Sequence, residues 1–154
     1  MPPSHDELVE QLIRSIDIRL LDPLEILLDG HDAVDALRTI VRVRAENWAY
    51  RLVKGDDPEA LGTAMRIAAT LYPGDGPFEP PVEWWRSPLG QTVVRRVGHP
   101  TARSVSYAVA GAMLGITRQG VHDLLSRGKL ARHPEGGVLP SSVRDRLLKL
   151  DPGC

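Results

Sequence analysis

The sequence predicts a mainly α-helical fold, and three observations indicate it. Apolar residues recur at spacings of three and four along several stretches, which is typical of helices that bury one face. Residues that commonly begin helices, such as Ser4, Asp22 and Asp57, stand just before these stretches. No part of residues 1–72 alternates apolar and polar side chains as a half-buried strand does. The chain has 154 residues, 42% of them hydrophobic, so it can form one compact domain or two small ones.

Four helices are expected in an acidic N-terminal region, residues 1–72, which would serve oligomerisation or partner binding. The helix starts are the capping box of Ser4 and Glu7, the Asp22-Pro23 pair, Asp32, and the Asp57-Pro58 pair. The third helix is expected to carry its apolar stripe on Val34, Leu37, Val41, Ala45, Trp48 and Leu52. The fourth is expected to carry its stripe on Leu61, Met65, Ala68 and Leu71.

A linker rich in Pro and Gly, residues 73–81, separates this region from a basic region, residues 82–154. The linker reads PGDGPFEPP and cannot continue a helix. Residues 1–80 hold 8 basic and 15 acidic side chains, a net charge of −7, whereas residues 81–154 hold 11 basic and 5 acidic side chains, a net charge of +6. This difference in charge indicates that the C-terminal half binds nucleic acid and that the N-terminal half is repelled by phosphate. The alternative is two solvated surfaces that differ in charge or attract each other within the molecule.

The basic region begins with elements that are expected to pack rather than to bind. Trp84 and Trp85 are predicted to lie in the core or between the two regions. Ser87-Pro88 then starts a helix that Gly98 ends.

The most informative stretch, residues 104–150, begins with two short helices. Ser106 can cap the first helix and Thr117 the second, with Gly115 as the left-handed residue of the turn between them. Helices joined by so short a turn cross steeply and need a small residue where they touch, which Gly111 supplies. The two helices are expected over residues 107–114 and 118–126, with inner faces formed by Ala110, Leu114, Ile116, Val121 and Leu124.

This stretch resembles the helix-turn-helix of the MerR/excisionase-type winged-helix family. The matching residues are Val105-Ser106, Ala110-Gly111, Leu114-Gly115-Ile116-Thr117-Arg118, Val121 and Arg127-Gly128-Lys129-Leu130. The resemblance implies wing strands at residues 131–133 and 137–139 and a closing helix capped by Ser141 or Ser142. The fold expected for the whole chain is therefore mainly α, with a helical N-terminal region and a C-terminal winged helix-turn-helix that has a small β-hairpin wing. The first helix departs from the family in being apolar nearly all round, which predicts that it is covered on more than one side.

The resemblance also implies that the second helix enters the major groove of duplex DNA. Arg118 and Gln119 have the chemistry to read guanine and adenine, and His122 lies one turn beyond Arg118. Thr117 could cap the helix and also reach a phosphate. Contacts to the DNA backbone are expected from Arg127, Lys129, Arg132 and His133. The alternative for each side chain is an ordinary solvated or internally satisfied polar residue.

The expected function is sequence-specific binding of double-stranded DNA in bacterial transcriptional control. Related modules also serve in recombination, plasmid maintenance and antitoxins, and the sequence does not choose among these roles. A homodimer held by the N-terminal region is expected, and its two-fold symmetry would make the DNA site an inverted repeat, although the chain shows no coiled-coil heptads. The alternative function is a protein-interaction module, such as an antitoxin or adaptor, whose acidic half binds a protein partner.

No enzymatic activity, metal or other cofactor is expected. The five histidines are scattered, and the single cysteine, Cys154, cannot build a zinc site. The sequence has no phosphate-binding glycine loop and no nucleophile motif. The polar start MPPSHDELVEQ lacks the apolar core of a signal peptide, and no apolar run is long enough for a membrane span. A cytoplasmic location at the nucleoid is therefore expected, without a membrane partner.

Overall fold

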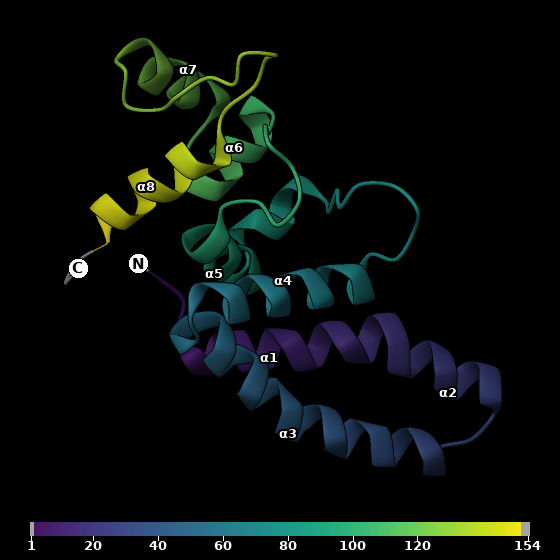
Figure 1. The fold of residues 1–154 in the computed structure, drawn as a ribbon. Coiled ribbons are helices and arrows are strands. Elements are labelled where there is room, and N and C mark those ends of the chain that lie inside the picture. The colour runs from purple at the N-terminus through teal and green to yellow at the C-terminus, as the bar shows by residue number, and fades with distance from the viewer. Residues whose placement is uncertain (1, 152–154) are drawn as a thin grey trace.

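The computed structural model describes residues 2–151, and it is built of helices joined by turns and loops (Figure 1). In chain order the α-helices are α1 (His5–Ile16), α2 (Asp22–Leu28), α3 (Asp32–Lys54), α4 (Asp57–Leu71), α5 (Pro88–Val97), α6 (Tyr107–Leu114), α7 (Arg118–Ser126) and α8 (Pro140–Leu150). A short π-helix, η1 (Asp17–Leu21), joins α1 to α2, and a 3₁₀ helix, η2 (Val82–Arg86), precedes α5. Cys154 lies outside the described residues. The prediction of a mainly helical fold is confirmed.

The predicted β-hairpin wing is wrong, because residues 2–151 contain no β-strand. Where the two wing strands were expected, the backbone makes only isolated bridges, from Val138 to Val105 and from Val138 to Arg132. The bridge to Arg132 is flanked by two bonds, from the Leu139 N–H to the Ala131 carbonyl at 2.9 Å and from the His133 N–H to the Gly137 carbonyl at 3.0 Å. Gly136 and Gly137 have a positive φ, at 107° and 82°, and the chain turns at these residues. The segment between α7 and α8 is therefore a loop pinned at Val138.

The helix starts predicted from capping signals are largely confirmed, with corrections at α8 and at the start of α2. Ser4 and Glu7 form the expected capping box at α1. Neither Ser141 nor Ser142 caps the closing helix, which begins at Pro140 after Leu139. The Ser142 hydroxyl instead donates to the Leu139 carbonyl and accepts from the Ala131 backbone N–H, so it fixes the preceding loop.

The junction between α1 and α2 runs on as one helical segment rather than breaking at Asp22-Pro23. Pro23 has no backbone N–H to donate, and the π-helical turn of η1 precedes it, a usual place for a change in helix register. Arg38 of α3 spans this junction, with ion pairs of 2.9 Å to Asp17, 2.7 Å to Asp22 and 3.4 Å to Glu25. The acidic side chains of η1 and α2 are thereby tied to α3.

The predicted stripe of α4 is half right, because Ala68 and Leu71 are buried as expected whereas Leu61 and Met65 are exposed. The helix instead buries a face built largely of small residues, namely Ala60, Thr63, Ala64, Ile67, Ala68 and Leu71. Small side chains let α4 approach α3 and α5 closely, so burial follows the alanines rather than the largest apolar residues.

Helix α5 lies between the N-terminal helices and the C-terminal helices, packing on α1, α3 and α4 on one side and on α8 on the other (Figure 1). Arg96 donates to the carbonyls of Leu52, Val53 and Gly55 at 2.8–2.9 Å, where α3 ends. A cation at this position suits the negative end of the α3 dipole. Arg95 points to α8 instead and pairs with Asp151.

The linker of residues 73–81 is anchored by aromatic packing. Phe78 is buried, and its ring centroid lies 5.5 Å from that of Tyr72, 5.4 Å from that of Trp84 and 6.2 Å from that of Trp85. These distances and the edge-on orientations are typical of favourable aromatic pairs. The prediction that the two tryptophans pack in the core is confirmed for Trp85, which is fully buried, and Trp84 is partly buried against the same cluster.

His99, which follows α5, packs its ring against the same cluster, 5.2 Å from Trp85. Burial lowers the pKa of His99 to about 4. Its Nδ1 accepts from the backbone N–H groups of Thr101 at 3.1 Å and Ala102 at 2.8 Å, which requires that this nitrogen carry no proton. The neutral imidazole therefore holds the loop that leads to α6.

We expect His99 to make the folded state less stable in acid. In the unfolded chain the histidine pKa is about 6.5, so between pH 6.5 and pH 4 the unfolded state binds a proton that the folded state does not. Stability attributable to His99 is complete above pH 6.5 and is lost as the pH falls toward 4, by on the order of 2 kcal/mol after allowance for partial exposure. Urea unfolding at several pH values measures the free energy of unfolding. Between pH 6.5 and 4 this free energy should depend less on pH for His99→Asn, which keeps an acceptor without a titrating ring. The same pH dependence in wild type and variant would contradict the role given to His99.

Candidate nucleic-acid interface

The candidate interface is built on α6 and α7, whose ends are fixed by side chains in the predicted places. The Ser106 hydroxyl accepts from the Val109 N–H at 3.1 Å and caps α6. Gly115 ends α6 with φ of 73°, a left-handed conformation that glycine adopts without strain. The Thr117 hydroxyl accepts from the Gly120 N–H at 3.0 Å and caps α7. The predicted helix-turn-helix is therefore present as a backbone arrangement.

Gly111 lies where the two helices come closest, as the sequence predicts. A Cβ at this position would lie 2.8 Å from the carbonyl oxygen of Ile116, a distance that side-chain carbons essentially never show. Ala110 and Val121 are fully buried beside it, and the other predicted inner-face residues are partly buried. Helix α6 is covered by η2, α7 and α8, which confirms that its apolar surface is buried on more than one side.

Helix α7 presents its polar residues to solvent. Thr117, Arg118, Gln119 and His122 are all exposed. Val121 and Leu125 are the buried residues of the helix. The four predicted contact residues of this helix are therefore all exposed, and they lie near its N-terminal end.

Asp123 is an acidic residue of α7 that was not predicted from the sequence. It is exposed, and its carboxylate accepts from the Gln119 side-chain amide at 3.2 Å. The i,i+4 spacing of Gln119 and Asp123 is the sequence signal that could have identified it. The contact orients the Gln119 amide, and a carboxylate in a major groove can itself accept from cytosine.

The remaining predicted contacts lie in the C-cap of α7 and the loop that follows. Gly128, with φ of 70°, ends the helix in a Schellman arrangement that leaves Arg127 and Lys129 exposed beside it. Arg132 is exposed and donates to the Tyr107 hydroxyl at 3.0 Å, so it is held against the start of α6. His133 is half-buried and its Nδ1 accepts from the Glu135 N–H at 3.0 Å, which places it within the turn itself.

The basic side chains of this surface make no ion pair with the acidic half within residues 2–151. Arg118, Arg127 and Arg132 are all exposed, and the ion pairs of the described chain lie elsewhere, chiefly on Arg38, Arg95 and Arg96. Figure 1 shows α7 at one end of the molecule and α2 and α3 at the other. The basic residues of α7 and its loop are therefore available to an external anion.

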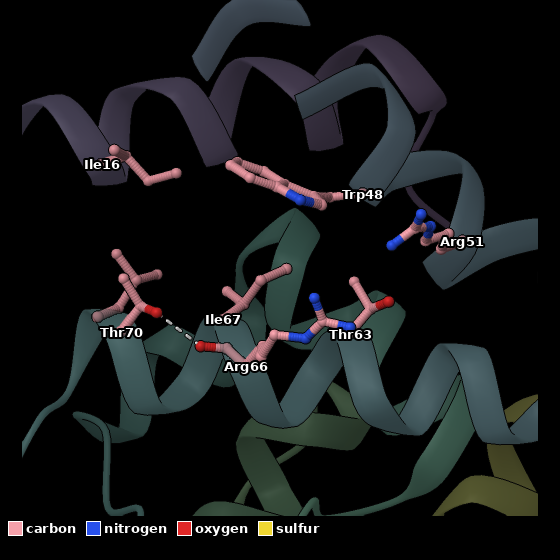
Figure 2. A pocket seen from close by; sticks show the side chains of 8 residues that line it. Ile16, Trp48, Arg51, Thr63, Arg66, Ile67 and Thr70 are labelled. Atoms are coloured by element: carbon pink, nitrogen blue, oxygen red, sulfur yellow. Dashed lines mark hydrogen bonds between the residues drawn. The ribbon is translucent and has the colours of Figure 1, made fainter. Parts of the chain in front are cut away.

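A cavity of about 190 Å³ lies elsewhere, between α1, α3 and α4. Figure 2 shows Trp48 and Arg51 on one side and Thr63, Arg66 and Ile67 on the other. The polar side-chain groups that line it are guanidinium, hydroxyl and indole N–H groups, and none of the lining residues carries a carboxylate, imidazole or thiol. The cavity therefore offers no general acid or base of the usual kind.

Residues 2–151 contain no group of three or more His, Cys, Asp or Glu side chains arranged to hold a metal ion. Within the same residues, none of the helices combines the length and apolar character needed to cross a membrane.

Comparison with known proteins finds no match to the chain among family models, curated proteins or solved structures. The likeness to the MerR/excisionase-type module therefore depends on the motif residues of the helix-turn-helix alone.

Proposed function

We propose that the chain is a sequence-specific double-stranded DNA-binding protein, a bacterial transcriptional regulator that inserts α7 into the major groove. The proposal is carried by the exposed first turn of α7, where Arg118 and Gln119 stand at the N-terminal end of the second helix of a helix-turn-helix. Arginine and glutamine are the side chains that most often pair with guanine and adenine edges. The bias toward Arg, Ala, Gly and Pro favours a bacterial source, and a cytoplasmic location is part of the same proposal.

Residues around α7 would support this function by contacts with DNA phosphates, which do not depend on the base sequence. Arg127, Lys129 and Arg132 lie at the C-terminal end of α7 and in its loop, where they would meet phosphates on either side of the groove. The positive helix N-terminus at Thr117 adds to this attraction. The acidic helices lie at the far end of the molecule, away from phosphate (Figure 1). The exposure of these arginines favours DNA binding over the adaptor function, in which ion pairs to the acidic half would bury them.

We expect Arg118→Ala to weaken specific DNA binding by about 10- to 100-fold and to relax base preference at one position. The DNA would come from selection on a random duplex pool, and affinity would be measured by fluorescence anisotropy at several salt concentrations. Lys129→Ala should weaken binding to all sequences and reduce the salt slope by about one. Arg42→Ala, an exposed arginine on α3, is the matched control and should bind as wild type does.

Two outcomes would overturn the proposal. One is a pool that yields no enriched sequence, together with no binding of wild type at low salt. The other is equal loss of affinity in Arg42→Ala and Arg118→Ala, because binding would then follow net charge rather than the surface of α7.

A further inference from the structure

Helix α3 carries apolar residues on two opposite faces, and only one of them is buried. The inner face, toward α1, α4 and α5, includes Val34, Ala45, Ala49 and Leu52. On the outer face Ile40, Val43 and Tyr50 are 53%, 64% and 62% exposed. Exposed apolar side chains that line up along one helix are typical of an interaction surface. The outer face of α3 is therefore the part of this helix at which a partner is expected.

The outer residues follow the spacing of a coiled-coil seam. Counting from Ala33, the spacings alternate between three and four through six exposed positions, which are Ala33, Ala36, Ile40, Val43, Asn47 and Tyr50. With Ala33 at position a, Ile40 and Asn47 also fall at a, and Ala36, Val43 and Tyr50 fall at d. The buried residues of the same helix fall at b, c and f, on the opposite side. These six residues are called the α3 seam below.

Asn47 indicates what pairs with the seam. An asparagine at a single a position is the residue that sets register in parallel two-stranded coiled coils, because its amide needs a second amide across the interface. In a symmetric parallel pair, Asn47 of each copy meets Asn47 of the other. In an antiparallel pair, positions a and d face each other, and the Asn47 amide would meet Ala36, Val43 or Tyr50, none of which carries a second amide.

The charges beside the seam favour the same arrangement. Glu46 falls at position g and Arg51 at the following e position, which is the pair that meets between parallel chains. The Glu46 carboxylate is largely exposed although His5 contacts one of its oxygens at 2.5 Å, so its other oxygen can accept from Arg51 of a second copy. Arg51 is exposed and makes no ion pair within residues 2–151.

A second apolar surface adjoins the start of the seam. Ile26, Leu27 and Leu28 at the end of α2 are all strongly exposed, and no residue of α2 is buried. Figure 1 shows α2 and the first half of α3 extending together from the rest of the molecule, joined by a short loop. A partner that lies along α3 would also approach these side chains.

We propose that the α3 seam pairs with the same seam of a second copy of this chain, in a parallel two-stranded coiled coil with Asn47 facing Asn47. The contact is isologous, with the two-fold axis along the helix pair. It does not depend on DNA binding, and self-association is measured without DNA, so failure of this proposal and of the proposed function are separate results.

The first test is the mass of the whole chain in solution, by sedimentation equilibrium between about 1 and 100 μM. Wild type should approach twice the 16.9-kDa mass of one chain. Ile40→Glu should raise the dissociation constant of the dimer by about 100-fold or more, because two carboxylates would face each other at an a layer. Met65→Glu is the matched control, since Met65 is 45% exposed on α4 and lies off the seam. A wild-type chain that stays monomeric at 100 μM, or a dimer that Ile40→Glu leaves intact, would overturn the proposal.

The second test concerns register. In a Cys154→Ser background, Val43→Cys should form an interchain disulfide under mild oxidation, because parallel pairing places the two Val43 positions side by side. Arg42→Cys, at position c, should not. Asn47→Val should tighten association and admit assemblies larger than a dimer, as loss of a buried a-position asparagine does. A dimer without the Val43→Cys crosslink, or with unchanged assembly in Asn47→Val, would refute the parallel arrangement.

Discussion

Removing the carboxylate of Asp151 is expected to lower the free energy of unfolding by about 3–5 kcal/mol. Asp151 follows α8 and holds Arg95 of α5 through two bonds, of 2.8 Å to Nε and 3.1 Å to Nη2. The two side chains are only 9% and 6% exposed, so Asp151→Ala would leave a guanidinium buried without an opposite charge. Gln91 accepts one further bond from Arg95 but carries no charge. Urea unfolding followed by circular dichroism measures the loss.

The control for this prediction is Asp145→Ala, which removes an exposed aspartate from α8 and should change stability by less than about 0.5 kcal/mol. The double variant Arg95→Met with Asp151→Ala should recover part of the loss, because it removes the buried charge and fills the space with apolar atoms. If the double variant is as unstable as the sum of the two single variants, the pair is not coupled in this way.

Gly90→Ala is expected to destabilise the protein by about 3 kcal/mol, because no room exists for a methyl group. A Cβ on Gly90 would lie 2.2 Å from the carbonyl oxygen of Trp84 and 2.7 Å from Cα of Trp85. Both are backbone atoms and neither can rotate aside, so α5 or η2 must move as a unit. The movement would disturb the packing of Trp85, the largest fully buried side chain among residues 2–151.

Gly62→Ala is the matched substitution, and it is expected to raise stability rather than lower it. Gly62 lies inside α4, and a Cβ there would meet nothing within 4 Å. Alanine in a helix interior is favoured over glycine by roughly 0.5–1 kcal/mol, so this variant should be slightly more stable than wild type. The midpoint of thermal unfolding of both variants tests this prediction. A Gly90→Ala protein as stable as the Gly62→Ala protein would show that α5 and η2 separate easily.

Helix starts could be predicted from the sequence because the information is local. Ser4, Ser87, Ser106 and Thr117 each accept a backbone N–H from a residue three positions later, and that geometry depends on the side chain alone. The same locality places Thr117, Arg118 and Gln119 at the start of α7, where all three are exposed. Whether they read bases remains a prediction.

Buried faces were harder to predict because they depend on which neighbour a helix meets. On α4 the larger residues Leu61 and Met65 suggested the wrong stripe, since close packing selected alanines. On α3 apolar residues occur on both the inner and the outer face, so the heptad spacing of the outer residues cannot be recognised in the sequence. Ile40 is distinguished from the buried residues of the helix only by its exposure in the structure. Leu37, expected in the core, lies exposed beside the outer face.

The predicted hairpin between α7 and α8 is reduced to a single bridge in the structure. Three-residue strands with Pro134 and Gly136 between them, and with Gly137 in the second strand, leave few backbone groups to pair. Val105, which lies far earlier in the chain, takes both backbone bonds of Val138 at 2.9 and 3.0 Å. No pattern within residues 131–139 could indicate this contact with Val105.

Arg95 and Arg96 are consecutive, yet they fasten α5 to opposite parts of the protein. Arg95 binds Asp151 beyond α8, and Arg96 binds the carbonyls at the end of α3. Successive residues of an α-helix point about 100° apart, so rotation of α5 about its axis would stretch one of these contacts whichever way it turned. The helix that would read DNA and the helix that would pair two copies are thus held at one relative orientation. A dimer so built would tolerate added base pairs between its half-sites only in steps of about one duplex turn, roughly 10 base pairs.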